Sequence, residues 1–239
     1  MIGIDLTKHG IDKNKLPNHI AVIMDGNGRW AKGKGLPRIE GHREGIESVR
    51  EIVESCGDIG IPYLTLYTFS EENWNRPMSE ITKLMHLLSQ TLESELDELN
   101  KNKVRVQFIG RLHKLPYSVR TRMQKMIETT KNNTGLTLTL ALSYGGRSEI
   151  IDAVRKIIHS NIRRIDERTF KKYLYAPKLP DPDLLIRSSG EQRVSNFLLY
   201  QIAYTEIYVT PVLWPDFRTP ELIQAIIEYQ HRKRKFGKI

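Results

Sequence analysis

A lone aspartate, Asp25, follows the apolar residues 20–24 and precedes a glycine-rich segment. Such a carboxylate can cap the following turn, or it can hold Mg²⁺, which bridges the oxygens of a diphosphate. Glu206, at the start of another apolar run, is a candidate second oxygen ligand. Because Mg²⁺ commonly takes only one or two protein carboxylates, this sparse pair is sufficient for a metal site.

Arginines gather around the ends of three apolar runs. A single arginine is ordinarily a surface residue, but guanidinium groups also bind phosphate oxygens in pairs. Their clustering therefore indicates an anion site. The residues are Arg29, Arg38, Arg43 and the neighbouring His42, then Arg76, and finally Arg187 and Arg193.

Two familiar phosphate-binding motifs fit the glycine-rich segment poorly. Gly26, Gly28 and Ala31 match the loose dinucleotide fingerprint, but no acidic residue follows at a second strand end. A Walker A loop would need a hydroxyl residue where Gly35 stands. What remains is a glycine-rich loop at a strand end that faces a helix, where backbone N–H groups can hold phosphate.

Strand and helix patterns alternate along the chain, which predicts an α/β fold with a mainly parallel sheet covered by helices. The predicted strands are residues 19–25, 63–69, 104–110, 136–143, 183–187 and 206–209. In such sheets ligands bind outside the carboxyl ends of the strands, where Asp25, Ser70 and Arg187 stand.

The helices are predicted from apolar stripes. One long helix after Pro77 runs through Leu99, and one after Gly146 should turn Ile150, Val154, Ile157 and Ile158 inward. Residues 196–204 are also predicted to be helical, and a last helix begins near Thr219.

The composition is that of one soluble domain, residues 1–239, with an N-terminal extension at 1–17 and a basic tail at 231–239. Lys and Arg number 37 against 28 Asp and Glu, so the net charge is +9. That surplus suits nucleic acid, an anionic membrane or a phosphorylated substrate, but no nucleic-acid recognition motif is present, so we expect no nucleic-acid partner. One cysteine excludes a disulfide framework, and no secretory signal begins the sequence, which predicts a cytoplasmic protein.

Five sequence blocks resemble those of the cis-prenyltransferases, and most of all those of bacterial undecaprenyl diphosphate synthases. They occur in order over nearly the whole chain. The blocks are MDGNGRWA at 24–31, GLPRIEGH at 35–42, TLYTFSEENWNRP at 65–77, DPDLLIRSSGEQRVSNFLL at 181–199 and WPDF at 214–217.

The resemblance implies a single cis-prenyltransferase domain with an apolar tunnel, usually a homodimer. It implies Mg²⁺-dependent sequential addition of isopentenyl diphosphate to an allylic diphosphate such as farnesyl diphosphate. The product would be a long polyprenyl diphosphate, undecaprenyl diphosphate, the precursor of the lipid carrier for cell-wall polysaccharides. The enzyme would be cytoplasmic, with peripheral contact at the inner face of the membrane for product release.

Two alternatives stay open. One is a short-chain cis-prenyltransferase, and the other is a non-catalytic partner subunit. The partner would lack the aspartate and the arginine segment, whereas Asp25, Arg29, Arg187 and Arg193 are all present.

The resemblance also assigns roles to residues. Asp25 and Asn73 would be catalytic, and Asp25 and Glu206 would hold the metal. Because an amide is a poor base, Asn73 is expected to orient a water or a diphosphate oxygen that takes the proton. The allylic diphosphate would lie at Gly26, Asn27, Gly28, Arg29, Trp30, Arg38 and His42. Further substrate contacts would come from Ser70, Glu71, Glu72, Asn73, Trp74 and Arg76, with isopentenyl diphosphate at Arg187, Arg193, Val194 and Ser195. Ser188 stands where threonine is common in the family.

A growing apolar chain needs apolar walls that shield it from water. Two predicted elements offer leucines for that purpose. One is the helix with Leu84, Leu88, Leu92 and Leu96, and the other is the strand at 136–142, which contains Leu138.

Overall fold

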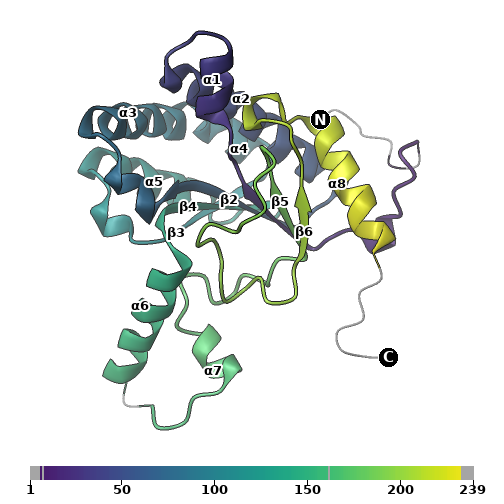
Figure 1. Ribbon diagram of the computed structural model, residues 1–239. Helices are drawn as coiled ribbons and strands as arrows, with labels where there is room; N and C mark the ends of the chain where they lie inside the picture. The colour runs from purple at the N-terminus through teal and green to yellow at the C-terminus, as the bar shows by residue number, and fades with distance from the viewer. Residues whose placement is uncertain (1–5, 7, 161, 233–239) are drawn as a thin grey trace.

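A six-stranded sheet forms the centre of the computed structural model (Figure 1), which describes residue 6, residues 8–160 and residues 162–232. The strand order is β3-β4-β2-β1-β5-β6, and every pairing is parallel. The predicted α/β fold with a mainly parallel sheet is therefore confirmed. The strands are β1 His19–Ile23, β2 Tyr63–Ser70, β3 Arg105–Ile109, β4 Thr137–Tyr144, β5 Leu184–Arg187 and β6 Glu206–Val209.

The central strands are buried on both faces, which explains their nearly continuous apolar sequences. In the register of β1, Ile23 lies beside Tyr67 of β2 and Arg187 of β5. Asp25 therefore lies just beyond the carboxyl end of β1, close to the carboxyl ends of β2 and β5.

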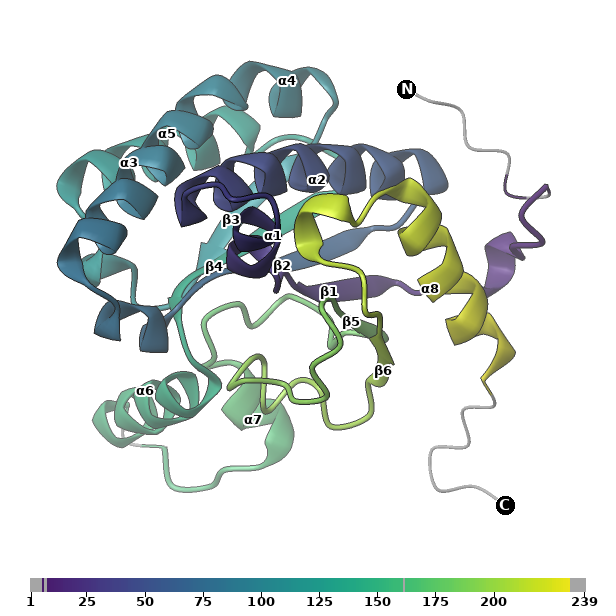
Figure 2. The same cartoon turned by 45° about the horizontal axis from the view of Figure 1, so that its top comes forward.

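Helices cover the two faces unequally. Figures 1 and 2 show α2, α3 and α5 on one side of the sheet and α6 and α7 on the other. The helices are α1 Asn27–Gly33, α2 Arg38–Ile59, α3 Met78–Ser94, α4 Leu96–Lys101, α5 Tyr117–Thr130, α6 Gly146–His159, α7 Glu167–Lys171 and α8 Thr219–His231. Short 3-10 turns are η1 Lys13–Lys15, η2 Glu71–Asn75, η3 Leu112–Lys114 and η4 Trp214–Asp216. Among the described residues, no helix combines the length and apolarity that a membrane crossing requires.

The larger hydrophobic core lies under α2, α3, α5 and α8, and a smaller one lies on the opposite face around Tyr144 and Phe197. Described residues of the predicted N-terminal extension belong to the larger core, because Leu6 and Ile11 are both buried in it. Gln230 of α8 also exchanges two hydrogen bonds with the backbone of Asp12. Residues 233–239 of the predicted basic tail lie outside the described residues.

The segment after Asp25, predicted to be a glycine-rich loop, is helix α1. Gly26 turns the chain sharply with φ +106°, in the left-handed region that favours glycine. Helix α1 then packs closely on α2, where a Cβ on Gly41 would lie 1.9 Å from the backbone oxygen of Asn27. Glycine therefore permits the α1–α2 contact.

Two helix predictions differ from the structure in extent. The long helix after Pro77 is divided into α3 and α4 at Glu95, whose carboxylate accepts hydrogen bonds from Arg50 of α2 at 2.7 and 3.1 Å. The helix predicted at 196–204 is a series of turns, because Asn196 and Leu198 have φ of 63° and 46°, which a right-handed helix excludes.

The inward face predicted for α6 is wrong for two residues. Val154 and Ile158 are 40% and 68% exposed, whereas Ile157 is buried as predicted. The buried face includes Glu149, whose carboxylate accepts hydrogen bonds from the Tyr144 hydroxyl at 2.5 Å and the Tyr175 backbone at 2.9 Å. These polar contacts rotate part of the apolar stripe outward.

The close α1–α2 approach predicts that Gly41→Ala destabilises the fold, because its methyl group cannot fit against the backbone of Asn27. The expected loss is about 1–3 kcal/mol in the free energy of unfolding. Gly57→Ala in the same helix is the matched control, since nothing lies within 4 Å of a Cβ there. It should stabilise the protein by roughly 0.5–1 kcal/mol. Urea denaturation measures both changes, and equal values for the two variants would contradict the packing argument.

Candidate active site

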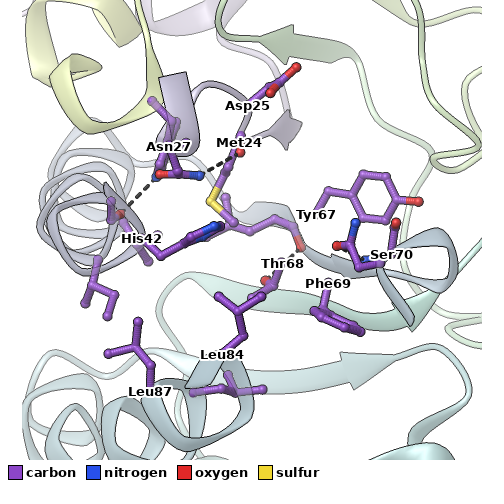
Figure 3. A pocket seen from close by; sticks show the side chains of 18 of the residues that line it. Met24, Asp25, Asn27, His42, Tyr67, Thr68, Phe69, Ser70, Leu84 and Leu87 are labelled. Carbon is purple, nitrogen blue, oxygen red and sulfur yellow. Dashed lines mark hydrogen bonds between the residues drawn. The ribbon is translucent and has the colours of Figure 1, made fainter. Parts of the chain in front are cut away.

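A cavity of about 510 Å³ lies between the carboxyl end of β1 and helices α1, α2 and α3. In Figure 3, Asp25 and Asn27 lie at one end of this site, Leu84 and Leu87 lie at the other, and His42 lies between them. The cavity thus has a polar region and an apolar region. Its polar lining includes Asp25, Arg29, Arg38, His42, Asn73 and Arg76, and its apolar lining includes Leu66, Phe69, Leu84, Leu87, Leu88 and Leu92.

The charges at the polar end are strongly unequal. Among the described residues that line the cavity, Asp25 is the single carboxylate, whereas Arg29, Lys32, Arg38 and Arg76 are cations. This lining suits a ligand with an anionic head and an apolar tail.

Asp25 is held by its neighbours in an ionised form. Its Oδ1 accepts a hydrogen bond from the Gly26 backbone at 2.7 Å, and its Oδ2 accepts one from Arg187 at 3.0 Å. Arg29 lies 3.3 Å from the same Oδ2. Burial raises the pKa of Asp25, but the hydrogen bonds from Arg187 and Gly26 and the two guanidinium charges outweigh burial, so its pKa is lowered.

Arg187 connects Asp25 to the segment at 193–195. Its side chain is only 5% exposed, and it donates hydrogen bonds to the Ser195 hydroxyl at 2.8 Å and to the Arg193 backbone oxygen. Glu191 lies between Arg29 and Arg193, 3.5 Å from the first and 2.5 Å from the second. A second arginine group therefore adjoins the cavity beside Asp25.

Arg38 and Arg76, both in the cavity lining, share one carboxylate partner. Glu80, in the first turn of α3, lies 3.1 Å from Arg76 and 3.2 Å from Arg38. Burial lowers the pKa of Arg76 and the nearby Arg38 lowers it further, which is partly offset by Glu80. Burial together with these two arginines also lowers the pKa of His42 to about 4, so its imidazole is neutral at pH 7.

The 3-10 turn η2 positions Asn73. The Asn73 side chain accepts a hydrogen bond from the Ser70 backbone at 3.1 Å and closes a capping box with that serine. Trp74 donates from its ring nitrogen to the Ser143 hydroxyl at 2.9 Å, which ties η2 to the end of β4. Both Ser70 and Asn73 line the cavity.

The structure brings together ten of the predicted site residues as lining of one cavity: Asp25, Gly26, Asn27, Gly28, Arg29, Arg38, His42, Ser70, Asn73 and Arg76. The others lie outside its lining. Trp30 on α1 donates to Asp216 at 2.7 Å, and Glu71 contacts Arg111 and Lys114. The remaining predicted residues outside the lining are Glu72, Trp74, Arg187, Arg193, Val194, Ser195 and Glu206.

The predicted sharing of one metal by Asp25 and Glu206 does not occur within this chain. Glu206 begins β6 and lies beside Leu184 of β5, which in turn lies beside Ile20 of β1. Glu206 is therefore at the amino end of the strands, whereas Asp25 is at their carboxyl end. Asp25 is five positions beyond Ile20 along the chain, which is about 16 Å for extended backbone at 3.3 Å per residue. Glu206 instead accepts a hydrogen bond from Arg232 at 2.9 Å. Within the described part of the chain, no group of three or more His, Cys, Asp or Glu side chains is arranged around a metal position.

Only some of the leucines predicted to line a tunnel border the cavity. Leu84, Leu88 and Leu92 line the cavity, whereas Leu96 and Leu138 do not and are packed in the core. On β4 the lining residue is Leu140, which the prediction did not single out within its strand.

Several residues at the site had no predicted role there, among them Lys32, Glu80 and Ser188. Glu80 stands in the first turn after Pro77, only four residues beyond Arg76, and this closeness of opposite charges in the sequence could have indicated the ion pair, although Arg76 itself precedes the helix. The Ser188 hydroxyl donates to the Asp25 backbone oxygen at 2.7 Å and accepts from the Asp25 backbone N–H at 2.9 Å. No sequence spacing predicts that contact, because it joins residues from two different strand ends.

Comparison with known proteins gives a consistent set of relatives. Residues 23–237 match the family described as "Putative undecaprenyl diphosphate synthase". An isoprenyl transferase of Heliobacterium mobile is 53% identical over 233 residues, which cover 95% of this chain and 90% of that protein.

Two solved structures share the fold. Lavandulyl diphosphate synthase from Lavandula x intermedia, in complex with dimethylallyl diphosphate, has a TM-score of 0.91 and 37% identity, covering 94% of this chain and 100% of that one. A protein of Campylobacter jejuni, titled "a probable undecaprenyl diphosphate synthase", has a TM-score of 0.80 and 36% identity, covering 93% and 99%.

The buried His42 predicts a pH dependence of stability. The unfolded chain takes up a proton on this imidazole near its ordinary pKa of 6.5, whereas the folded protein does so only near pH 4. The contribution of the neutral His42 imidazole to the free energy of unfolding is therefore fully present above pH 6.5. It is lost as the pH falls toward 4, by an amount on the order of 3 kcal/mol.

We expect His42→Asn to lose less stability than the wild type between pH 7 and about 4.5, since it removes this proton uptake. His86→Asn, at an exposed position of α3, is the control and should follow the wild type. Urea denaturation at each pH gives the comparison. Parallel curves for wild type and His42→Asn would contradict the assignment.

Proposed function

Because the chain belongs to the undecaprenyl diphosphate synthase family and is a prenyl-transferring enzyme, we propose that it condenses isopentenyl diphosphate repeatedly onto an allylic diphosphate, forming a cis double bond each time. The observation that carries the proposal is the cavity itself. It joins four cations and one carboxylate at one end to a leucine-rich interior at the other. An allylic diphosphate has the complementary form, with an anionic head and a hydrocarbon tail.

The two arginine groups suggest where each substrate binds. The allylic diphosphate would lie at Arg29, Arg38 and Arg76, with its tail between α2 and α3. Isopentenyl diphosphate would lie at Arg187, Arg193 and Ser195, adjacent to Asp25. Guanidinium groups at both positions would bind diphosphate oxygens and stabilise charge on the departing group.

The proposed reaction transfers one prenyl group per cycle. The allylic C–O bond breaks, and the diphosphate leaves with the electron pair. The alkene of isopentenyl diphosphate supplies the electrons of the new C–C bond, and a proton is then lost to form the new double bond. Asn73 would orient the water or diphosphate oxygen that accepts this proton, because its amide is not itself a base.

Asp25 fits a role as the carboxylate that holds Mg²⁺ with the diphosphate. Its side chain is about one-third exposed toward the cavity and ionised, and Mg²⁺ commonly uses one or two carboxylates together with substrate phosphates. The ion would neutralise charge as the diphosphate departs. Glu206 is not part of this proposal, because it lies at the amino end of the strands, opposite to Asp25.

We propose a long polyprenyl diphosphate, undecaprenyl diphosphate, as the product, serving as the precursor of a cell-wall lipid carrier. Ten apolar residues from α2, α3 and the sheet line the cavity interior beyond its polar end, which supports a hydrocarbon product. They are Ile46, Val49, Leu66, Phe69, Leu84, Met85, Leu87, Leu88, Leu92 and Leu140. A short-chain product is the competing function, and measured product length separates the two.

The proposal extends to a cytoplasmic homodimer that touches the inner membrane face during product release. Ile151, Val154 and Ile158 give α6 an exposed apolar face, which supports pairing with a second copy. Leu36 and Met78 are 42% and 73% exposed, two residues before the paired Arg38 and Glu80, which supports lipid contact near the polar end of the cavity.

Replacement of Asp25 tests the catalytic role. Asp25→Asn keeps a hydrogen-bond acceptor for Arg187 but removes the charge, so turnover should fall by roughly 10²- to 10³-fold while the fold is retained. Asp25→Ala should also lose stability, since it leaves a buried guanidinium without its carboxylate. Turnover is measured with Mg²⁺, farnesyl diphosphate and labelled isopentenyl diphosphate, and thermal unfolding gives the control. Near-normal turnover of folded Asp25→Asn would refute the assignment.

Product length tests the apolar end of the cavity. Leu88→Trp should shorten the products, because the indole fills part of the cavity. Leu140→Ala should lengthen them, because it removes a side chain from the cavity wall. Leu138→Ala is the matched control on the same strand and should leave the length distribution unchanged, since Leu138 is buried outside the cavity. Chromatography of the products decides. An effect of Leu138→Ala without one of Leu140→Ala would place the tunnel elsewhere.

A further inference from the structure

Asn196 lies where three segments of the chain meet. Its backbone oxygen accepts a hydrogen bond from the Gly146 N–H at 2.7 Å, and its Oδ1 accepts one from the Arg147 N–H at 2.9 Å, so it caps the start of α6. Its Nδ2 donates to Glu72 Oε1 at 2.8 Å. One amide side chain thus contacts both α6 and the turn η2.

The backbone around Asn196 adopts conformations that need support. Ser195, Asn196 and Leu198 all have left-handed φ, at 45°, 63° and 46°. Such conformations are uncommon for residues other than glycine, although asparagine tolerates them best. Arg187 donates to the Ser195 hydroxyl, and Glu72 accepts a hydrogen bond from the side chain of the next residue, Asn196.

The partner of Asn196 is adjacent in sequence to Asn73. Glu72 and Asn73 both belong to η2, whose geometry is fixed by the capping box and by Trp74. The Asn196–Glu72 hydrogen bond therefore connects the turn that presents Asn73 with the segment that carries Arg193 and Ser195.

We propose that Asn196 is a positioning residue that sets the isopentenyl diphosphate segment against the Asn73 turn through its hydrogen bond to Glu72. This inference rests on the proposed function, because it assigns Arg193 and Ser195 to isopentenyl diphosphate. Asn196 acts through its neighbours, and it needs no contact with the substrate itself.

Asn196→Asp breaks this link selectively. The new carboxylate can still accept from Arg147 and cap α6, and aspartate also tolerates the left-handed region. Toward Glu72, however, a donor becomes an anion facing an anion. We expect the KM for isopentenyl diphosphate to rise and kcat to fall, each by about fivefold to tenfold, while the KM for farnesyl diphosphate changes by less than about twofold.

A reciprocal exchange restores the contact. In Glu72→Gln/Asn196→Asp the glutamine amide donates to the aspartate, so the hydrogen bond is rebuilt with its direction reversed. Glu72→Gln alone keeps the bond, because its amide oxygen can accept from Asn196. The double variant should therefore bring both the raised KM and the lowered kcat of Asn196→Asp most of the way back to the wild-type values, a non-additive result that a double-mutant cycle measures.

Two controls separate contact from charge and from stability. Glu191→Gln/Asn196→Asp removes a carboxylate that contacts Arg29 and Arg193 and does not face Asn196, so it should give no recovery. Asn133→Asp alters an asparagine that bonds Asn100 and Val104, far along the chain from the site. It should change the melting temperature without changing the ratio of the two KM values.

The positioning role would be overturned if Glu191→Gln/Asn196→Asp restored KM and kcat as well as Glu72→Gln/Asn196→Asp does. It would also be overturned if Glu72→Gln/Asn196→Asp restored neither value. A wild-type KM for isopentenyl diphosphate in folded Asn196→Asp would do the same. Failure of the proposed function is recognised separately, because the wild-type enzyme would then elongate no allylic diphosphate.

Discussion

Asp25 holds a negative charge in a cavity whose other charged lining residues, among those the structure describes, are positive. Its charge is stabilised by Arg187, which is almost fully buried and in turn depends on Asp25 as its carboxylate partner. The two residues meet because β1 and β5 are parallel neighbours with Ile23 beside Arg187. A carboxylate held this way stays ionised and remains open to the cavity, which is what binding of a cation with an anionic substrate requires.

The change from polar to apolar lining follows from the direction of two helices. Along one face of α2 the cavity meets Arg38, then His42, then Val49. In the first turn of α3, Glu80 contacts Arg38 and Arg76. Further along the same helix, Leu84, Leu88 and Leu92 line the apolar interior of the cavity. Residues three or four apart lie on the same face of a helix, so each helix carries both kinds of side chain in sequence along its axis. The chemistry at the strand ends and the hydrophobic interior are therefore encoded in the same two elements.

The sequence sufficed to predict six strands in a mainly parallel sheet and the cluster of arginines around Asp25, because both depend on local patterns and on one rule of parallel sheets. Asp25 follows a predicted strand and Glu206 begins one, but a sheet predicted to be only mainly parallel left open that the two positions meet. Every pairing in the structure is parallel, so Asp25 and Glu206 lie at opposite ends of the strands. The burial of Glu149 likewise depends on Tyr144 and Tyr175, which only the tertiary structure brings to it. Leu138 and Leu140 share a periodicity, and only packing decides which one borders the cavity.

The strand order explains how two substrates could be served by one carboxylate. The chain passes from β1 to β2 on one side and later returns to β5 on the other, so β1 lies at the point where the connections diverge. Ligand crevices form at such a switch point, outside the carboxyl ends of the strands. The residues after β2 supply Asn73 and Arg76, those from the end of β5 supply Arg187 and Ser195, and Asp25 stands between them. In the proposed reaction a prenyl group crosses from one of these flanks to the other, so the central strand is where a residue must stand to act on both diphosphates.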